Sequence, residues 1–324
     1  MVPRYRGTKS HPRPVTHRYP LPAAMLRSQK TEVRTVQYRS GAKLDSSQMG
    51  SGGGRRGTTV ALGGGAGILL IILALLFGVN PSDLLGGASG QAPAPAGTDT
   101  DRFAHCTTVT EISKDRDCRF VAYTNSIQAY WAKAYSGYGK TRTVVFDGQV
   151  ATACGTATAS VGPFYCPEDK IVYLESTFFD QMLQGQLGAK GGDAAEAYVI
   201  AHEYGHHISN LTGNLAKAQS FSGTGPKSAQ VRLELQADCY AGAWLANAAS
   251  DPQSPIESIT EDDVNLAVDA AKAVGDDRIQ LRSSGKVSPE SWTHGSSDMR
   301  RKWLAVGFNS GDPAKCNTFA ANAP

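Results

Sequence analysis

Three of the chain's seven histidines fall within six positions of the stretch 197–210, AYVIAHEYGHHISN. His202 and His206 lie four residues apart, about 40° around a helix of 3.6 residues per turn, so both imidazoles can reach one metal ion. Glu203 stands beside the first histidine, where it can take a proton from a metal-bound water. His207 is turned away from this side. The His-Glu-x-x-His pattern is the signature of zinc hydrolases, and the alternative is a packed helix with solvated histidines.

A catalytic zinc needs a third protein ligand and an open fourth position. A third histidine on the same helix is absent, because Ser209 and Thr212 occupy the places that it would need. Further along, Glu234 and Asp238 lie four residues apart in a largely apolar stretch, where two unpartnered carboxylates would be costly to bury. We assign Glu234 to the metal and Asp238 to a hydrogen bond that orients a ligand histidine. The alternative is a solvated pair on an exposed face.

Two helices must position these side chains. The first is predicted from about Ala194 to Leu211, with Asp193 as N-cap and Glu196 completing a capping box. The second covers residues 228–244. A short β-type run at 171–174 precedes the metal helix, and it is either an edge strand that pairs with an extended substrate or a plain core strand.

A lone histidine near the end of the chain is a candidate for transition-state stabilisation. His294 precedes a helix predicted to start near Asp298, and it could donate a hydrogen bond to the oxyanion that forms when hydroxide attacks a carbonyl. The alternative is a capping or surface histidine. Arg300 and Arg301 are weaker candidates for the same role, and residues 276–278 are interpreted as a loop network without function.

Charge and hydropathy divide the chain. Residues 1–56 hold 12 Lys and Arg against 2 acids, a net charge of +10, which leaves −7 for the rest of a chain whose total is +3. Residues 57–79 carry no charge, and about 20 apolar residues suffice to cross a bilayer. We predict a transmembrane helix there, with a buried globular helix as the alternative. A charged region of 56 residues is too long for a cleaved signal peptide.

The flanking segments set the expected topology. Arg55 and Arg56 abut the predicted span, so the amino terminus is expected in the cytoplasm and the catalytic domain outside it, on a single-pass protein of the cell membrane. Residues 1–56 are predicted to be a disordered basic tail. Residues 80–101 form a Pro/Gly/Ala-rich stalk, and residues 102–324 suffice for one domain with a core. We expect no nucleic-acid partner.

All six cysteines follow the apolar stretch. An even set in an oxidising compartment indicates disulfides, although six free buried thiols are the alternative. Two pairs have equal spacings of twelve residues and leave one pair over: Cys106 with Cys118, Cys154 with Cys166, and Cys239 with Cys316.

Five ordered blocks together resemble a known family. They are GPFYCP at 162–167, HEYGHHI at 202–208, ELQADCYAG at 234–242, GDDRIQ at 275–280 and THGSS at 293–297. They resemble the neutral zinc metallopeptidases of bacteria, the YpfJ-like group, over roughly residues 106–319. The resemblance implies an α+β, zincin-like fold of the minigluzincin type, mainly helical with a small sheet after one transmembrane helix, and it carries over Glu234 as third ligand.

The sequence therefore predicts a membrane-anchored peptidase that cleaves peptide or protein substrates. One zinc ion held by His202, His206 and Glu234 activates water, and Glu203 is the general base. Cobalt and manganese accept the same ligands. A membrane-tethered zinc-binding module without turnover and a zinc amidase acting on cell-wall peptides are the alternatives, and the intact Glu203 favours catalysis.

Overall fold

The computed structural model describes residues 36–52 and 101–324. The predicted transmembrane helix at 57–79, nearly all of the predicted stalk and residues 1–35 lie outside the described residues. Within the described ranges, no helix is long and apolar enough to cross a membrane.

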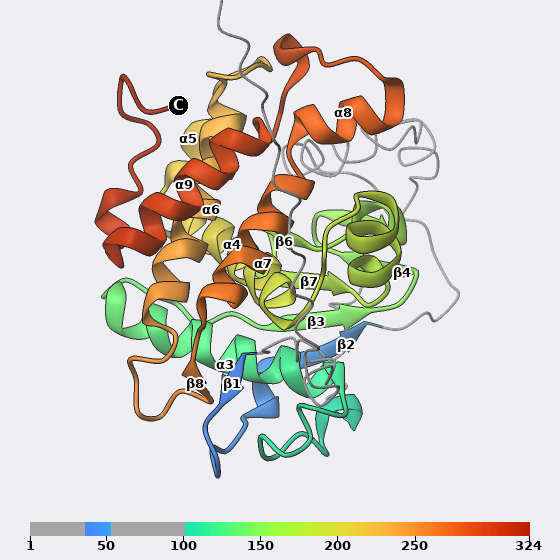
Figure 1. Cartoon of the computed structure of the whole chain (residues 1–324), viewed down its shortest axis with the longest axis vertical. Helices are drawn as coiled ribbons and strands as arrows, with labels where there is room; N and C mark the ends of the chain where they lie inside the picture. Colours follow the sequence, from blue (N-terminus) through green and yellow to red (C-terminus); the bar gives the residue numbers. More distant parts are fainter. Residues whose placement is uncertain (1–35, 53–100) are drawn as a thin grey trace, which may run out of the picture. The chain divides into compact units, whose positions relative to one another are not determined.

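About half of the described structure is helical (Figure 1), and many helices begin at a capping side chain. Their bounds are α3 (Arg116–Ala134), α4 (Asp193–Leu211), α5 (Asn214–Gln219), α6 (Ala229–Asn247), α7 (Glu261–Ala273), α8 (Asp276–Ser284) and α9 (Ser297–Ser310). Asp115, Ser228 and Ser296 accept hydrogen bonds from first-turn N–H groups of α3, α6 and α9. Thr260 does so for α7 in a full capping box with Asp263. Each such cap satisfies a donor that the helix itself leaves without a partner.

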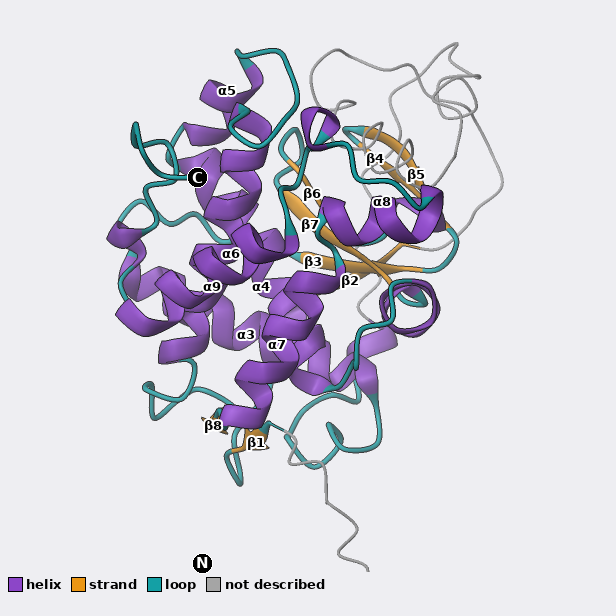
Figure 2. Ribbon diagram, turned by 45° about the horizontal axis from the view of Figure 1, so that its top comes forward, coloured by secondary structure: helices purple, strands orange, loops and turns teal. Residues whose placement is uncertain are grey.

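A four-stranded mixed sheet lies on one side of helices α4, α6 and α9 (Figure 2). Its order is β2 (Met49–Gly52), β3 (Thr143–Phe146), β7 (Ile171–Glu175) and β6 (Phe164–Cys166); the first three strands are parallel and β6 is antiparallel to β7. The run predicted at 171–174 is thus a strand, but it is interior. Because β7 has β3 and β6 as neighbours, the edge-strand interpretation is wrong for it, and the core-strand alternative holds. In the described sheet β2 and β6 are the two edge strands.

Smaller elements complete the fold. A hairpin joins β4 (Gln149–Thr152) to β5 (Gly155–Thr158), and β1 (Gln37–Tyr38) pairs with β8 (Ile256–Ser258). A π-helical segment, η4 (Phe178–Gln186), lies between β7 and α4 in the chain.

The segment 36–52 belongs to this fold. Met49 and Val36 are fully buried, and β2 pairs in parallel with β3 along its whole length. The prediction of a disordered tail over 1–56 is therefore wrong for residues 36–52. Composition missed them because a short polar strand is held chiefly by backbone hydrogen bonds to a distant strand, which the residue types do not reveal.

The three predicted disulfides are confirmed. Cys106 bonds to Cys118, Cys154 to Cys166 and Cys239 to Cys316, and no free cysteine remains.

Replacing Met49 by Ala tests whether the N-terminal segment is part of the folded core. We expect the full-length protein to lose about 2–5 kcal/mol of unfolding free energy, because a buried methionine is removed from a packed site. Denaturant titration measures the loss, and Lys43→Ala, at an exposed position of the same segment, is the matched control. Equal stability of both variants would contradict the packing of this segment.

Candidate active site

The start of α4 is fixed by charge rather than by the predicted capping box. The helix begins at Asp193, one residue earlier than predicted, and Gly192 with a φ of 95° is its N-cap. Glu196 instead accepts hydrogen bonds from Arg116 at 2.7 Å and Arg119 at 2.9 Å, both on α3. These ion pairs tie the metal-motif helix to α3.

A glycine lets α4 and α6 approach closely. A Cβ atom at Gly205 would lie 2.8 Å from the Cα of Ala237 on α6, a distance that real Cβ atoms essentially never show. The contact therefore requires glycine inside the His-Glu-x-x-His motif. It brings the carboxylates of Glu234 and Asp238 against the two motif histidines.

Three side chains from these helices converge at metal-binding distances. His202 Nε2 lies 3.2 Å from both Glu234 Oε2 and His206 Nε2, and His206 Nε2 lies 3.5 Å from Glu234 Oε1. Ligand atoms placed tetrahedrally about 2.0–2.1 Å from zinc are separated by about 3.3 Å. All three residues are buried, so the donor set fits a zinc ion.

The electrostatics of this cluster favour a cation. Burial alone would raise the pKa of Glu234, but His206 and His294 hold it well below its usual range. Burial likewise lowers the pKa of His202, yet hydrogen bonds to Asp238 and Glu234 outweigh burial and raise it to about 9. The negative charge that holds a proton on His202 would equally attract a divalent metal ion.

Glu203 lies beside this cluster without being part of it. Its side chain is buried and lines the same cleft as His202, His206 and Glu234. Burial raises its pKa, and the neighbouring His206 and His202 oppose that shift only in part. A carboxylate whose pKa lies above the usual value is better suited to exchange protons near neutral pH.

Asp238 holds His202 through a buried charge network. Its Oδ1 accepts hydrogen bonds from His202 Nδ1 at 2.9 Å, from the Tyr198 hydroxyl at 2.6 Å and from Arg300 Nη2 at 2.9 Å, and its Oδ2 accepts one from Arg300 Nε at 2.8 Å. Burial raises the pKa of Asp238, but Arg300 and His202 lower it to about 2. Because Nδ1 of His202 donates, Nε2 carries the lone pair that a metal needs.

This network shows where the two candidate arginines lie. Arg300 is buried, lines the cleft and pairs with Asp238. Arg301 is exposed and lies 3.5 Å from Asp298. Sequence spacing could not link Arg300 with Asp238, because 62 residues separate them.

His294 lines the same cleft, held by an aspartate that the sequence did not suggest. Oδ2 of Asp276 accepts the backbone N–H groups of Thr293, His294 and Gly295 at 2.7–2.9 Å, and its Oδ1 lies 3.4 Å from His294 Nδ1. The loop interpretation of residues 276–278 is therefore wrong, because they open α8, and Asp276 binds the backbone beside His294. Burial lowers the pKa of His294, but Glu234 and Asp276 raise it above its ordinary value.

An apolar cleft of about 100 Å³ opens beside the cluster. Its walls come from edge strand β6, from the π-helical segment η4 and from α8. The apolar lining residues include Val161, Phe164, Phe178, Met182, Leu187, Val199 and Ile279.

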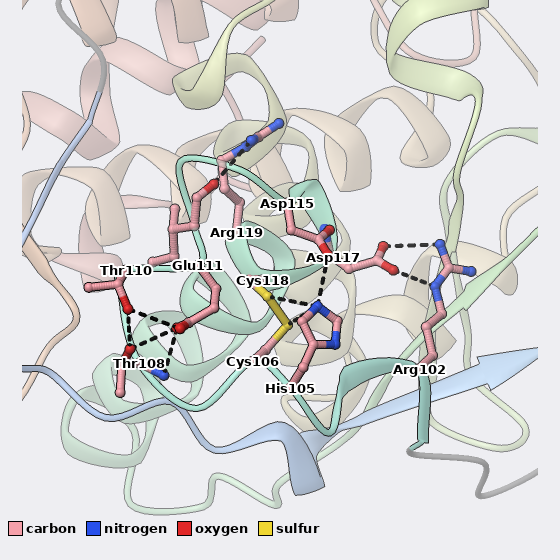
Figure 3. The surroundings of a disulfide bond; sticks show 11 residues. Arg102, His105, Cys106, Thr108, Thr110, Glu111, Asp115, Asp117, Cys118 and Arg119 are labelled. Carbon is pink, nitrogen blue, oxygen red and sulfur yellow. Dashed lines mark hydrogen bonds and ion pairs between the residues drawn. A yellow bond between two sulfur atoms is a disulfide. The ribbon is translucent and has the colours of Figure 1, made fainter.

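Two other histidines are accounted for without a metal role. His207 is turned away, as predicted, and contacts the Tyr165 hydroxyl at 2.9 Å and the Gly139 carbonyl at 2.7 Å. His105 lies 3.5–3.6 Å from both sulfurs of the Cys106–Cys118 disulfide and 2.8 Å from Asp115 (Figure 3). His105, Cys106 and Cys118 lie close enough together to resemble a metal site, but they offer no thiolate ligand, because both sulfurs are in the disulfide.

These features agree with a match to one protein family. The model of the family described as "Putative neutral zinc metallopeptidase" matches residues 28–319. The chain therefore belongs to this family, and zinc is the metal that its name implies.

Among its relatives are uncharacterized proteins of Mycobacterium tuberculosis and Mycobacterium bovis, each 45% identical over 260 residues, covering 76% of this chain and 85% of theirs. The uncharacterized protein YpfJ of Escherichia coli is 43% identical over 197 residues, covering 58% of this chain and 66% of its own. No solved structure matches the chain.

Changing Asp238 to Asn should weaken zinc binding by about 10–100-fold, because the imidazole of His202 loses its charged orienting partner. Competition with a chromophoric chelator measures the affinity, and circular dichroism checks the fold, since the change also leaves Arg300 without its partner. Tyr198→Phe removes one neutral hydrogen bond to the same carboxylate and should have a smaller effect. Unchanged affinity in the folded Asp238→Asn protein would show that Asp238 does not orient the ligand.

Proposed function

We propose that the protein is a zinc-dependent peptidase of the gluzincin type, in which His202, His206 and Glu234 hold one zinc ion. The observation that carries the proposal is the convergence of these three buried side chains at zinc-ligand separations, with Glu203 beside them in a cleft. A third ligand supplied as a glutamate by a second helix is the gluzincin arrangement that the resemblance implies. The mixed helix and sheet structure is consistent with a zincin-like domain.

The chain's own groups divide the remaining chemistry. Bound zinc would act as a Lewis acid that acidifies water and polarises the scissile carbonyl. Glu203 takes the proton of the attacking water and passes it to the leaving amine. His294 donates a hydrogen bond to the carbonyl oxygen as negative charge develops there. Asp276 holds the backbone of this segment, and the Thr293 hydroxyl lies 2.9 Å from His294 Nδ1.

The cleft supports a peptide as the substrate. β6 is one of the two terminal strands of the described sheet, and it supplies Phe164 and Tyr165 to the cleft wall. An extended peptide can add to such an edge through backbone hydrogen bonds. The apolar lining would receive a large apolar side chain next to the bond that is cut.

The cellular location forms part of the same proposal. Three disulfides are stable in an oxidising compartment, which supports an extracytoplasmic catalytic domain. The apolar stretch at 57–79 supports attachment to the cell membrane.

A Glu203→Gln variant separates metal binding from catalysis. We expect both this variant and the unchanged protein to bind about one zinc ion, and the variant to lose at least about 10²-fold in kcat, because only the proton acceptor is removed. Zinc content by mass spectrometry and cleavage of a peptide library measure the two properties, and cuts should lie beside large apolar residues. Zinc in both proteins with cleavage by neither would favour a binding module. Cleavage of cell-wall peptides alone would favour the amidase alternative.

Replacing His294 by Ala should lower kcat by about 10²–10³-fold while zinc content stays the same, because a donor to the developing oxyanion is lost. Steady-state kinetics on a peptide cut by the unchanged enzyme gives the number. His105→Ala, at the Cys106–Cys118 disulfide, is the matched control and should leave kcat unchanged. A loss of zinc together with activity would reassign His294 to metal binding.

A further inference from the structure

The described residues on either side of the apolar stretch meet in space. β2 ends at Gly52, and the next described element is the short helical turn η2 (Asp101–Phe103), which packs against β2. Met49 and Phe103 are both fully buried in the same core cluster. The described chain thus ends at Gly52 and resumes at Asp101 in neighbouring parts of the same domain.

The segment 36–52 is held by specific contacts as well as by the sheet. The hydroxyls of Tyr38 and Tyr123 lie 2.6 Å apart in the interior. The backbone N–H of Asp45 donates to Asn125 Oδ1 at 2.8 Å, and Asn125 Nδ2 returns a bond to the Asp45 carbonyl at 3.0 Å.

Two more contacts reach other parts of the domain. Gln128 Nε2 donates to Gln48 Oε1 at 2.8 Å, so Tyr123, Asn125 and Gln128 all reach the segment from α3. On its other side Arg39 Nε donates to the Ser254 carbonyl at 3.2 Å. Such matched polar pairs are not expected of a tail that docks by chance.

A single membrane crossing is incompatible with this pairing. The hydrocarbon layer is about 30 Å thick, whereas paired strands lie about 4.8 Å apart. If residues 57–79 crossed the bilayer once, β2 and β3 would lie on opposite faces and could not share backbone hydrogen bonds.

We propose that residues 36–52 are an integral part of the peptidase domain and lie on the same side of the membrane as residues 101–324. The domain is then discontinuous in sequence, with the apolar stretch inside an insertion between β2 and η2. This revises the expected cytoplasmic location of residues 36–52. It depends on the sheet pairing and not on peptidase activity.

The test compares two single-cysteine variants of the full-length protein, since all six native cysteines are in disulfides. Lys43→Cys reports on the N-terminal segment and Ser283→Cys on α8, and both positions are exposed. Spheroplasts are treated with a membrane-impermeant maleimide before and after permeabilisation. A cytosolic cysteine protein serves as the internal control.

We expect both cysteines to be labelled to the same extent before permeabilisation. Labelling of Ser283→Cys alone would overturn the proposal, because the two segments would then lie on opposite sides. Protection of both until permeabilisation would support the shared side and would count against the extracytoplasmic location, so the two ideas fail separately.

A disulfide trap tests the pairing itself. A protease site is inserted near residue 92, so that cleavage separates an N-terminal fragment from a C-terminal one. In the variant with Asp45→Cys and Asn125→Cys, a disulfide should keep the two fragments joined on a non-reducing gel. Free thiols are blocked before lysis, so that the cross-link must have formed in the cell. Asp45→Cys with Ser283→Cys is the control and should not cross-link. Separation of the fragments in the first variant, combined with unequal maleimide labelling, would refute the proposal.

Discussion

The close approach of α4 and α6 at Gly205 is the constraint on which the site depends. Because no side chain separates the helices there, Glu234 and Asp238 lie directly against the two motif histidines. Helices α6 and α9 approach each other in the same way. A Cβ atom at Gly242 on α6 or at Gly307 on α9 would collide with the backbone of the other helix. Backbone contact between helices thus places α9, and with it Arg300, at a fixed distance from the candidate metal ligands.

Three buried carboxylates of this domain are each compensated by specific partners. Asp238 has Arg300 and His202, Glu196 has two arginines of α3, and Asp276 has three backbone N–H groups. An uncompensated charge in such surroundings would cost several kcal/mol. These pairs specify geometry more than they add stability, and each one holds either a motif helix or a cleft residue in position.

The sequence predicted the features that depend on the spacing of residues close together in the chain. The four-residue steps of His202–His206 and Glu234–Asp238 survive in the structure because each pair lies on one helix, and the twelve-residue cysteine spacings correspond to two real disulfides. Contacts between distant segments could not be predicted in the same way. Asp276 reaches His294 across 18 residues, and the strand at Met49 pairs with Thr143 although nothing in its composition marks it as part of a core. The roles of the metal ligands remain predictions that the geometry supports.

The Cys239–Cys316 disulfide has a consequence for where such a site can exist. The bond closes a loop of 77 residues, and chain-entropy arguments assign about 4–5 kcal/mol to a closure of that length. Glu234 and Asp238 lie on the helix where the loop begins, whereas His294 and Arg300 lie inside it. A disulfide therefore cross-links the two halves of the candidate active site only under oxidising conditions. The redox potential of the compartment would then determine how stable the assembled site is. Newly made chains in a reducing cytoplasm would lack the Cys239–Cys316 bond that stabilises it.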